Sequence, residues 1–267
     1  MKTKLLVILS DIHAGSDVGL APPLVKTRKG NVIGFGENIH QQWLWENWLD
    51  GISRIKTIVG KSPCSLLTNG DMTEGIHHRC EAALVAALIE THTDMAVECM
   101  QPLLKICQQR YVTLGTECHT QHAEDIFAEK IGAETGKAKN RWLIDADGCL
   151  IDALHHMTTT SRANLEASAM SILMGNARIN TMRSGHRVPN VFIRAHRHCG
   201  GHYSDGQGLF CVTGGWQFLT RFGFKAVPDS VPRPSFMVLD WRDSKIGELP
   251  RVHNITFDTP QDEIASL

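Results

Sequence analysis

Short apolar runs in this chain repeatedly end at aspartate or histidine residues. The run KLLVILS leads into Asp11-Ile12-His13, and NVFIR leads into His196-Arg197-His198. Between them lie Gly70-Asp71, the cluster Gly115–His119, and His155-His156. Short continuous apolar runs bounded by turn residues are typical of buried β-strands. The sequence therefore predicts several buried strands whose following loops carry carboxylates and imidazoles.

Longer amphipathic stretches alternate with these runs and predict helices. Between residues 37 and 59, apolar residues recur at steps of three and four, which gives a helix one buried face. The same reasoning predicts helices at 80–109, 120–131 and 164–182, with Pro102 bending or breaking the first of them. Strands are predicted at 4–10, 64–69 and 111–114, and then at 190–194, 208–213, 235–241 and 251–257.

A hairpin is predicted where Asp147-Gly148 separates two apolar runs, because an Asp-Gly pair fits the tight turn that joins paired strands. Strands and helices alternate early in the chain, while strands cluster late. This order favours an α/β fold in which a central sandwich of two mixed sheets is flanked by helices. No repeat or linker divides the sequence, so we expect one domain over residues 1–267.

Composition narrows the possible partners and compartments. The 267 residues carry a formal net charge of -1 and no block of like charges, so a polycationic nucleic-acid arm or a membrane-surface tail is not indicated. The first apolar run is too short for a signal peptide or a membrane span. The eight cysteines are dispersed without a CxxC pair, which favours reduced thiols in a cytoplasmic protein.

The chemistry of the loop residues suggests a metal site. Ligands of open α/β sheets gather beyond the carboxyl ends of the strands, so one pocket could collect all five clusters. Carboxylate and neutral imidazole together suit a divalent cation of borderline hardness. Each cluster alone has a plainer explanation as a turn, but five in succession after predicted strands favour a metal-centred hydrolase.

In their order, these clusters resemble the calcineurin-like metallophosphoesterase superfamily, whose blocks run D-x-H, G-D, G-N-H-[DE], H and G-H-x-H. The resemblance implies a four-layer αββα sandwich with a two-metal site at the sheet edges. It implies that Asp11, His13 and His198 hold one metal, that Asp71 bridges both, and that His155 and His196 hold the second.

The third block departs from the family pattern. Thr116 replaces the asparagine that normally serves the second metal, and the histidine is displaced to His119 by Glu117-Cys118. Glu117 would supply a carboxylate in place of the amide, or else the second metal would be weak or absent. Ala195 also stands where the family usually has glycine. These departures resemble variants from phage and prophage members.

Several residues keep two interpretations. His155 is favoured over His156 as the ligand. His119 either acts in catalysis, donating a proton to the leaving oxygen or bonding a phosphate oxygen, or caps the helix expected near residue 120. Glu74 is expected to start a helix or to support a ligand. The substrate-binding candidates, which are equally compatible with solvated loops, are His78, Arg79 and Arg162.

The resulting functional prediction is hydrolysis of phosphomonoesters or phosphodiesters by a metal-bound hydroxide, with two divalent ions (Mn, Fe, Zn, Ni or Co) as cofactors. The substrate is a phosphoester, with nucleotides and nucleic acids among the options. One alternative is a nuclease that uses a basic rim of Arg79, Arg162, Arg194 and Arg197. Another is a binding or scaffold module whose catalysis has decayed, as the irregular third block would allow.

Overall fold

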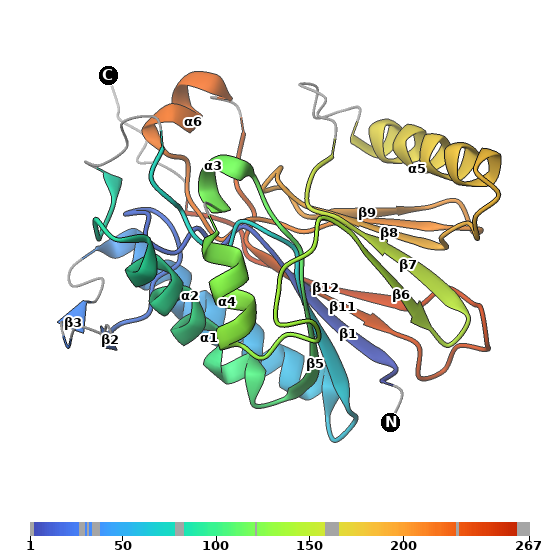
Figure 1. Cartoon of the computed structure of the whole chain (residues 1–267), viewed down its shortest axis with the longest axis horizontal. Coiled ribbons are helices and arrows are strands. Elements are labelled where there is room, and N and C mark those ends of the chain that lie inside the picture. Colours follow the sequence, from blue (N-terminus) through green and yellow to red (C-terminus); the bar gives the residue numbers. More distant parts are fainter. Residues whose placement is uncertain are drawn as a thin grey trace.

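Two five-stranded β-sheets lie face to face at the centre of the molecule (Figure 1). The computed structural model describes residues 3–26, 30, 32–33, 38–77, 83–120, 122–157, 166–227 and 230–260. The first sheet has the order β12-β11-β1-β4-β5, and the second has the order β6-β7-β8-β10-β9. A separate two-stranded ribbon joins β2 (Val25–Lys26) to β3 (Val32–Ile33).

Both sheets are mixed, with a parallel core of three strands. In the first sheet β1, β4 and β5 run parallel, while β11 runs antiparallel to β1 and β12 runs antiparallel to β11. In the second, β7, β8 and β10 run parallel, and β6 and β9 are antiparallel edges. The strands are β1 (Leu5–Leu9), β4 (Cys64–Thr68), β5 (Cys107–Val112), β6 (Trp142–Ala146), β7 (Cys149–Ala153), β8 (Val191–Arg194), β9 (Gly201–Ser204), β10 (Leu209–Val212), β11 (Ser235–Asp240) and β12 (Arg251–Thr256).

Helices cover the outer faces of both sheets. Helix α1 begins after Asn38, whose side chain accepts a hydrogen bond from the Gln41 backbone N–H and so caps it. The helices are α1 (Ile39–Val59), α2 (Ile89–Leu104), α3 (Glu117–Thr120), α4 (Ala123–Lys130), α5 (Glu166–Arg183) and α6 (Arg221–Ala226). Figure 1 shows α1, α2 and α4 on the side of the first sheet and α5 on the side of the second.

Three apolar cores separate the four layers, because alternate residues of each strand point to opposite faces. Leu5, Val7 and Leu9 of β1 belong to the core under α1, α2 and α4. Leu6 and Ile8, the intervening residues, belong to the core between the two sheets. A third core joins the second sheet to Met170 and Met174 of α5. The predicted αββα sandwich is thereby confirmed.

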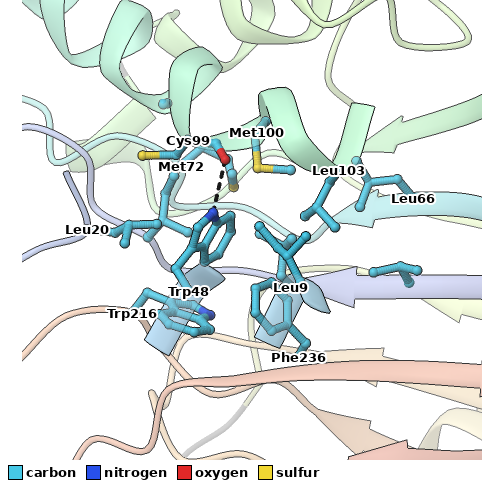
Figure 2. Close-up of a cluster of buried hydrophobic side chains, with 14 of the residues drawn as sticks. Leu9, Leu20, Trp48, Leu66, Met72, Cys99, Met100, Leu103, Trp216 and Phe236 are labelled. Carbon is cyan, nitrogen blue, oxygen red and sulfur yellow. Dashed lines mark hydrogen bonds between the residues drawn. The ribbon is translucent and has the colours of Figure 1, made fainter. Parts of the chain in front are cut away.

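Trp48 anchors α1 in the largest of these cores. Figure 2 shows its indole beside Trp216 and Phe236, with ring centroids 4.8 and 4.7 Å away. The indole N–H donates to the Cys99 carbonyl of α2 at 3.0 Å, so the buried polar atom is satisfied. This contact fixes α1 and α2 against the first sheet.

The two sheets meet at the carboxyl ends of their parallel strands. Ser10, just after β1, forms a parallel bridge to Gly215, which follows β10, and its hydroxyl bonds the hydroxyl of Thr213. The Trp216 backbone N–H donates to the Asp11 carbonyl at 2.8 Å. The loops of both sheets are therefore held at one edge of the sandwich.

Several local predictions need correction. Of the predicted helix 80–109, residues 89–104 are helical, and α2 continues past Pro102 to its end at Leu104. Residues 107–112 form β5, because pairing with β4 outweighs the helical pattern of this half-polar segment. Strands β2, β3 and β9 and the short helices α3 and α6 were not predicted. The hairpin does turn at Asp147-Gly148, where both residues have positive φ. Among the described residues, no helix is long and apolar enough to cross a membrane.

Candidate metal centre

The loops at the shared sheet edge bring together the acidic and imidazole side chains singled out in the sequence. Nε2 of His155 lies 3.1 Å from Oδ2 of Asp71 and 3.9 Å from Oδ1 of Asp11. Nε2 of His198 lies 3.5 Å from the same Asp11 oxygen and 3.2 Å from Nε2 of His13. Residues from four strand ends of two sheets thus meet within one small volume.

The backbone of this cluster is unusual. In the described part of the chain, seven non-glycine residues have positive φ, and five of them are in the cluster: Asp11, His13, Asp71, His196 and His198. Such conformations cost free energy for residues with a side chain, and they concentrate at functional sites. Their repetition here indicates that the loops are shaped to aim these side chains inward.

Three overlapping groups of side chains are close enough to share a cation. One consists of Asp11, His13 and His198, and another of Asp11, Asp71 and His155. His155 also forms a group with His196 and His156, whose ring lies 5.0 Å from that of His196. His155 is buried and faces both carboxylates, whereas His156 is exposed. Asp11 is common to two of these groups, and Asp71 belongs to one of them.

Thr116, which stands where the resemblance implies an asparagine, acts through hydrogen bonds. Its backbone N–H donates to Oδ1 of Asp71 at 2.6 Å, and its hydroxyl donates to Oδ2 at 3.0 Å. The hydroxyl also lies 3.1 Å from Nδ1 of His196. Glu117, proposed as the replacement carboxylate, is exposed on α3 and belongs to none of the cation groups found among the described residues. The structure therefore does not bring Glu117 into the cluster.

His119 joins the cluster through Glu74. Its Nδ1–H donates to the Glu74 carbonyl at 2.7 Å, and its ring lies 4.6 Å from that of His13. The alternative of a helix cap is not realised, since α4 has His122 at its N-cap and no side-chain cap bond. Together with Glu74 and His13, His119 makes a further group that could hold a cation.

Glu74 contributes more than the sequence indicated. One carboxylate oxygen lies 3.0 Å from Nδ1 of His13, and the other lies 3.1 Å from Nε2 of His77. The Gln217 amide also donates to Glu74 at 2.8 Å. A carboxylate behind an imidazole fixes the ring and its tautomer and raises its basicity. Glu74 can thus orient His13 with Nε2 turned toward His198.

A second buried carboxylate, Glu124 of α4, supports the loops from behind. It accepts hydrogen bonds from the backbone N–H groups of Met72 at 3.3 Å and Gly115 at 2.6 Å. Burial, with the negative charge of Asp71 adding to it, raises the pKa of Glu124 to about 8. Gly115 itself has no room for a side chain, because a Cβ there would lie 2.1 Å from Oδ1 of Asp71. No local sequence pattern indicated this role for Glu124, which lies in an ordinary amphipathic helix.

The electrostatics of the cluster are dominated by burial and by the two aspartates. Burial alone would lower the pKa of His155, but the charges of Asp71 and Asp11 outweigh it and raise that pKa to about 10. Burial and the neighbouring His155 lower the pKa of His196 to about 4. Burial and His13 hold the pKa of His198 well below its usual value. His196 and His198 are therefore neutral near pH 7 and able to act as ligands.

The donor set fits divalent cations. Oδ1 of Asp11 is buried without a hydrogen-bond partner, although unpaired buried acceptors are costly. Two imidazole nitrogens, on His13 and His198, face each other at 3.2 Å. A cation between these atoms would satisfy the carboxylate oxygen and both nitrogens at once.

The predicted substrate-binding residues are only partly accounted for. His78, Arg79 and Arg162 lie outside the described residues. Arg194, suggested for a basic rim, is buried and donates to Oδ2 of Asp152 at 3.0 Å, so it is a structural ion pair.

Comparison with known proteins gives only distant matches. No family model matches the chain, and no curated protein matches it. Similar solved structures include wild-type Vps29 complexed with zinc from Entamoeba histolytica, at 13% identity and a TM-score of 0.44 over 95% of this chain and 99% of that one. A novel archaeal phosphodiesterase matches at 10% identity and a TM-score of 0.45, with the same coverages. Vacuolar protein sorting 29 from Cryptosporidium parvum matches at 12% identity and a TM-score of 0.43, over 97% of this chain and 100% of that one. At these values, any functional assignment depends on the residues of this chain.

Proposed function

We propose that this chain is a metal-dependent phosphoesterase of the calcineurin-like type with a two-metal centre. The observation that carries the proposal is the meeting of two buried aspartates and four histidines from both sheets, with one aspartate oxygen left unpaired. Local turn structure can explain each pair of residues taken alone. It does not explain why side chains from four separate strand ends lie within ligand distance of each other. The archaeal phosphodiesterase among the similar structures has a compatible activity.

In this proposal Asp11, His13 and His198 hold one ion, and His155 and His196 hold the other. Asp71 lies between them, 3.1 Å from His155. Two divalent ions carry four positive charges, of which Asp11 and Asp71 neutralise two. The remaining positive charge would attract and orient a phosphate group.

Divalent ions at this centre would supply water of lowered pKa and would stabilise the negative charge that develops on the phosphoryl oxygens. The residues of the chain position these components. Glu74 holds His13 through Nδ1, and Thr116 holds both oxygens of Asp71. His119 donates Nδ1–H to the Glu74 carbonyl, so Nε2 of the neutral ring is a proton acceptor, and it would pass a proton to the leaving oxygen only from the doubly protonated imidazolium form.

Asp71→Asn tests the proposal. It keeps the size of the side chain but removes one negative charge and one acceptor beside His155. We expect metal-supported hydrolysis of p-nitrophenyl phosphate and bis(p-nitrophenyl) phosphate to be abolished, with thermal unfolding of the metal-free protein showing an intact fold. Asp50→Asn, the same change on the exposed face of α1, is the matched control and should keep full activity. Unchanged turnover by folded Asp71→Asn would refute the proposal.

A binding or scaffold module with decayed catalysis is the second candidate. It is favoured by Thr116, since a hydroxyl already bonded to Asp71 is a poorer ligand than an amide oxygen. Metal analysis after chelation and reconstitution separates the two, because an active centre should bind about two ions per chain. Binding of no metal would favour the scaffold.

One activity screen can identify both the substrate class and the metal. The metal-free protein should be resupplied separately with Mn, Fe, Zn, Ni and Co and assayed against monoesters, diesters and nucleic acids. The net charge of -1 disfavours a nonspecific nuclease, which needs clustered cations to contact phosphates. We therefore expect turnover of small phosphoesters to exceed that of DNA or RNA.

A further inference from the structure

A cavity of about 510 Å³ opens beside the metal cluster. His13, Asp71, His196 and His198 form part of its lining. Much of the rest comes from residues 217–227, which follow β10 and include α6, and from Ser230 and Pro232. Figure 1 shows α6 and α3 at the same end of the molecule, and residues of both line this cavity. Its size falls within the range of about 300–1,000 Å³ typical of small-molecule sites.

One part of the cavity is apolar. We call it the apolar wall, and it consists of Phe218, Leu219, Phe222, Val227 and Pro232. The Phe218 ring is held in place by Trp43 and His40, with centroids 5.4 and 4.9 Å away. Phe222 is 68% exposed, so a ligand that covered it would remove apolar surface from water. The two phenylalanines offer flat faces for an aromatic ring.

The charged groups of the cavity favour an anion. Among the described residues that line it, the only carboxylates are Asp71 and Glu74, and both are engaged by histidines. Two arginines also line it: Arg221, and Arg197, whose guanidinium lies 3.6 Å from a carboxylate oxygen of Glu166. A ligand with a negative group near the cluster and an apolar group against the wall is complementary to both parts.

We propose that the cavity selects phosphoesters with an aromatic group, whose ring packs on the apolar wall while the phosphate lies at the metal cluster. This inference rests on the proposed function and names its substrate class. The ring could belong to a simple aryl ester or to a nucleoside, since both present a flat apolar surface. An unsubstituted alkyl phosphate would leave the wall in water.

Binding of phosphonates tests the inference without requiring turnover, because their carbon–phosphorus bond is not hydrolysed as an ester. Calorimetry of the manganese-loaded protein would compare methylphosphonate, phenylphosphonate and the methylenephosphonate analogue of adenosine monophosphate. We expect phenylphosphonate to bind about tenfold more tightly than methylphosphonate, as partial burial of one ring allows. A gain for phenylphosphonate alone supports a simple aryl ester, and a larger gain for the adenosine analogue supports a nucleotide.

Two neighbouring phenylalanines of α6 provide a matched pair of variants. Phe222→Ala, in the apolar wall, should remove most of the preference for phenylphosphonate over methylphosphonate. Phe224→Ala, 57% exposed on the same helix but not lining the cavity, should keep the preference. Equal binding of the two phosphonates by the native protein would overturn the inference, as would an undiminished preference in Phe222→Ala.

The binding measurements also distinguish failure of this inference from failure of the proposed function on which it rests. If manganese binds but aromatic phosphonates bind no better than methylphosphonate, the aromatic selectivity is wrong and the metal centre stands. If none of Mn, Fe, Zn, Ni and Co binds, the proposed function fails and the inference fails with it.

Discussion

Gly215→Ala should weaken metal binding, because the added methyl group would displace the His198 ring. Gly215 follows β10, and a Cβ built there would lie 2.4 Å from Cγ of His198 and 2.7 Å from its Nδ1. Ordinary contacts of this kind begin at 3.4 Å, so the imidazole must recede by about 1 Å. That ring is the one whose Nε2 lies 3.2 Å from His13 and 3.5 Å from Asp11.

The size of the effect follows from the importance of ligand placement. Loss of the support that orients a ligand typically costs about 10–100-fold in metal affinity, which corresponds to roughly 1.4–2.8 kcal/mol. Gly215 does not have a positive φ, so alanine introduces no backbone strain of its own. We therefore expect weaker metal binding with a largely preserved fold.

Calorimetric titration of chelator-treated protein with Mn²⁺ or Zn²⁺ measures this effect, and thermal unfolding in chelator monitors the fold. Gly175→Ala is the control, because no heavy atom lies within 4 Å of the added Cβ and the change falls within α5. The control should leave metal affinity unchanged and stabilise α5 by up to about 1 kcal/mol. Native affinity in a folded Gly215→Ala protein would show that His198 does not hold a metal.

Two further predictions concern stability. Asp152→Ala leaves the buried Arg194 guanidinium without its carboxylate partner and should lower the free energy of unfolding, measured in urea, by about 3–5 kcal/mol. Asp258→Ala, at the exposed pair with Arg233, should change it by no more than about 1 kcal/mol. Equal effects of the two substitutions would contradict the burial of Arg194. In metal-free protein the pKa values of His155 and Glu124 are raised, to about 10 and about 8, so each binds its proton more tightly when folded and its stabilising contribution is lost as pH rises. Above about pH 7.5, His196 and His198 are neutral in both the folded and the unfolded chain, so the free energy of unfolding in chelator should fall between about pH 7.5 and 8.5. A rise over that window would show that His155 and Glu124 do not control it.

Much of the site could be predicted from the sequence, because it depends on local patterns of apolar residues. The apolar runs before Asp11, Asp71 and His196 identify buried strands, and those strands do occur as β1, β4 and β8. The residues after them were chosen for their chemistry, and the structure brings them to one edge. The parallel cores of both sheets are the reason, since all their carboxyl ends face the same way.

The residues that support the cluster from outside it could not be predicted from local sequence patterns. Glu124 is a single carboxylate in an amphipathic helix, and only its approach to Met72 and Gly115 shows that it holds two loops. Glu117 looked like the better replacement ligand by residue type. Its placement on the exposed side of α3 depends on where the chain turns after β5, which hydrophobic periodicity does not encode.

The sequence by itself determined the buried strands, the layered α/β class and the set of carboxylates and imidazoles beside the strand ends. These properties follow from the spacing of apolar residues along a few turns or strands of chain. Only the tertiary structure decided that Asp11 is shared between two groups, that Glu74 stands behind His13, and that α6 lines a cavity beside the cluster. These contacts join residues from different loops and sheets, so they depend on strand order and on the packing of the two sheets, which no local pattern specifies.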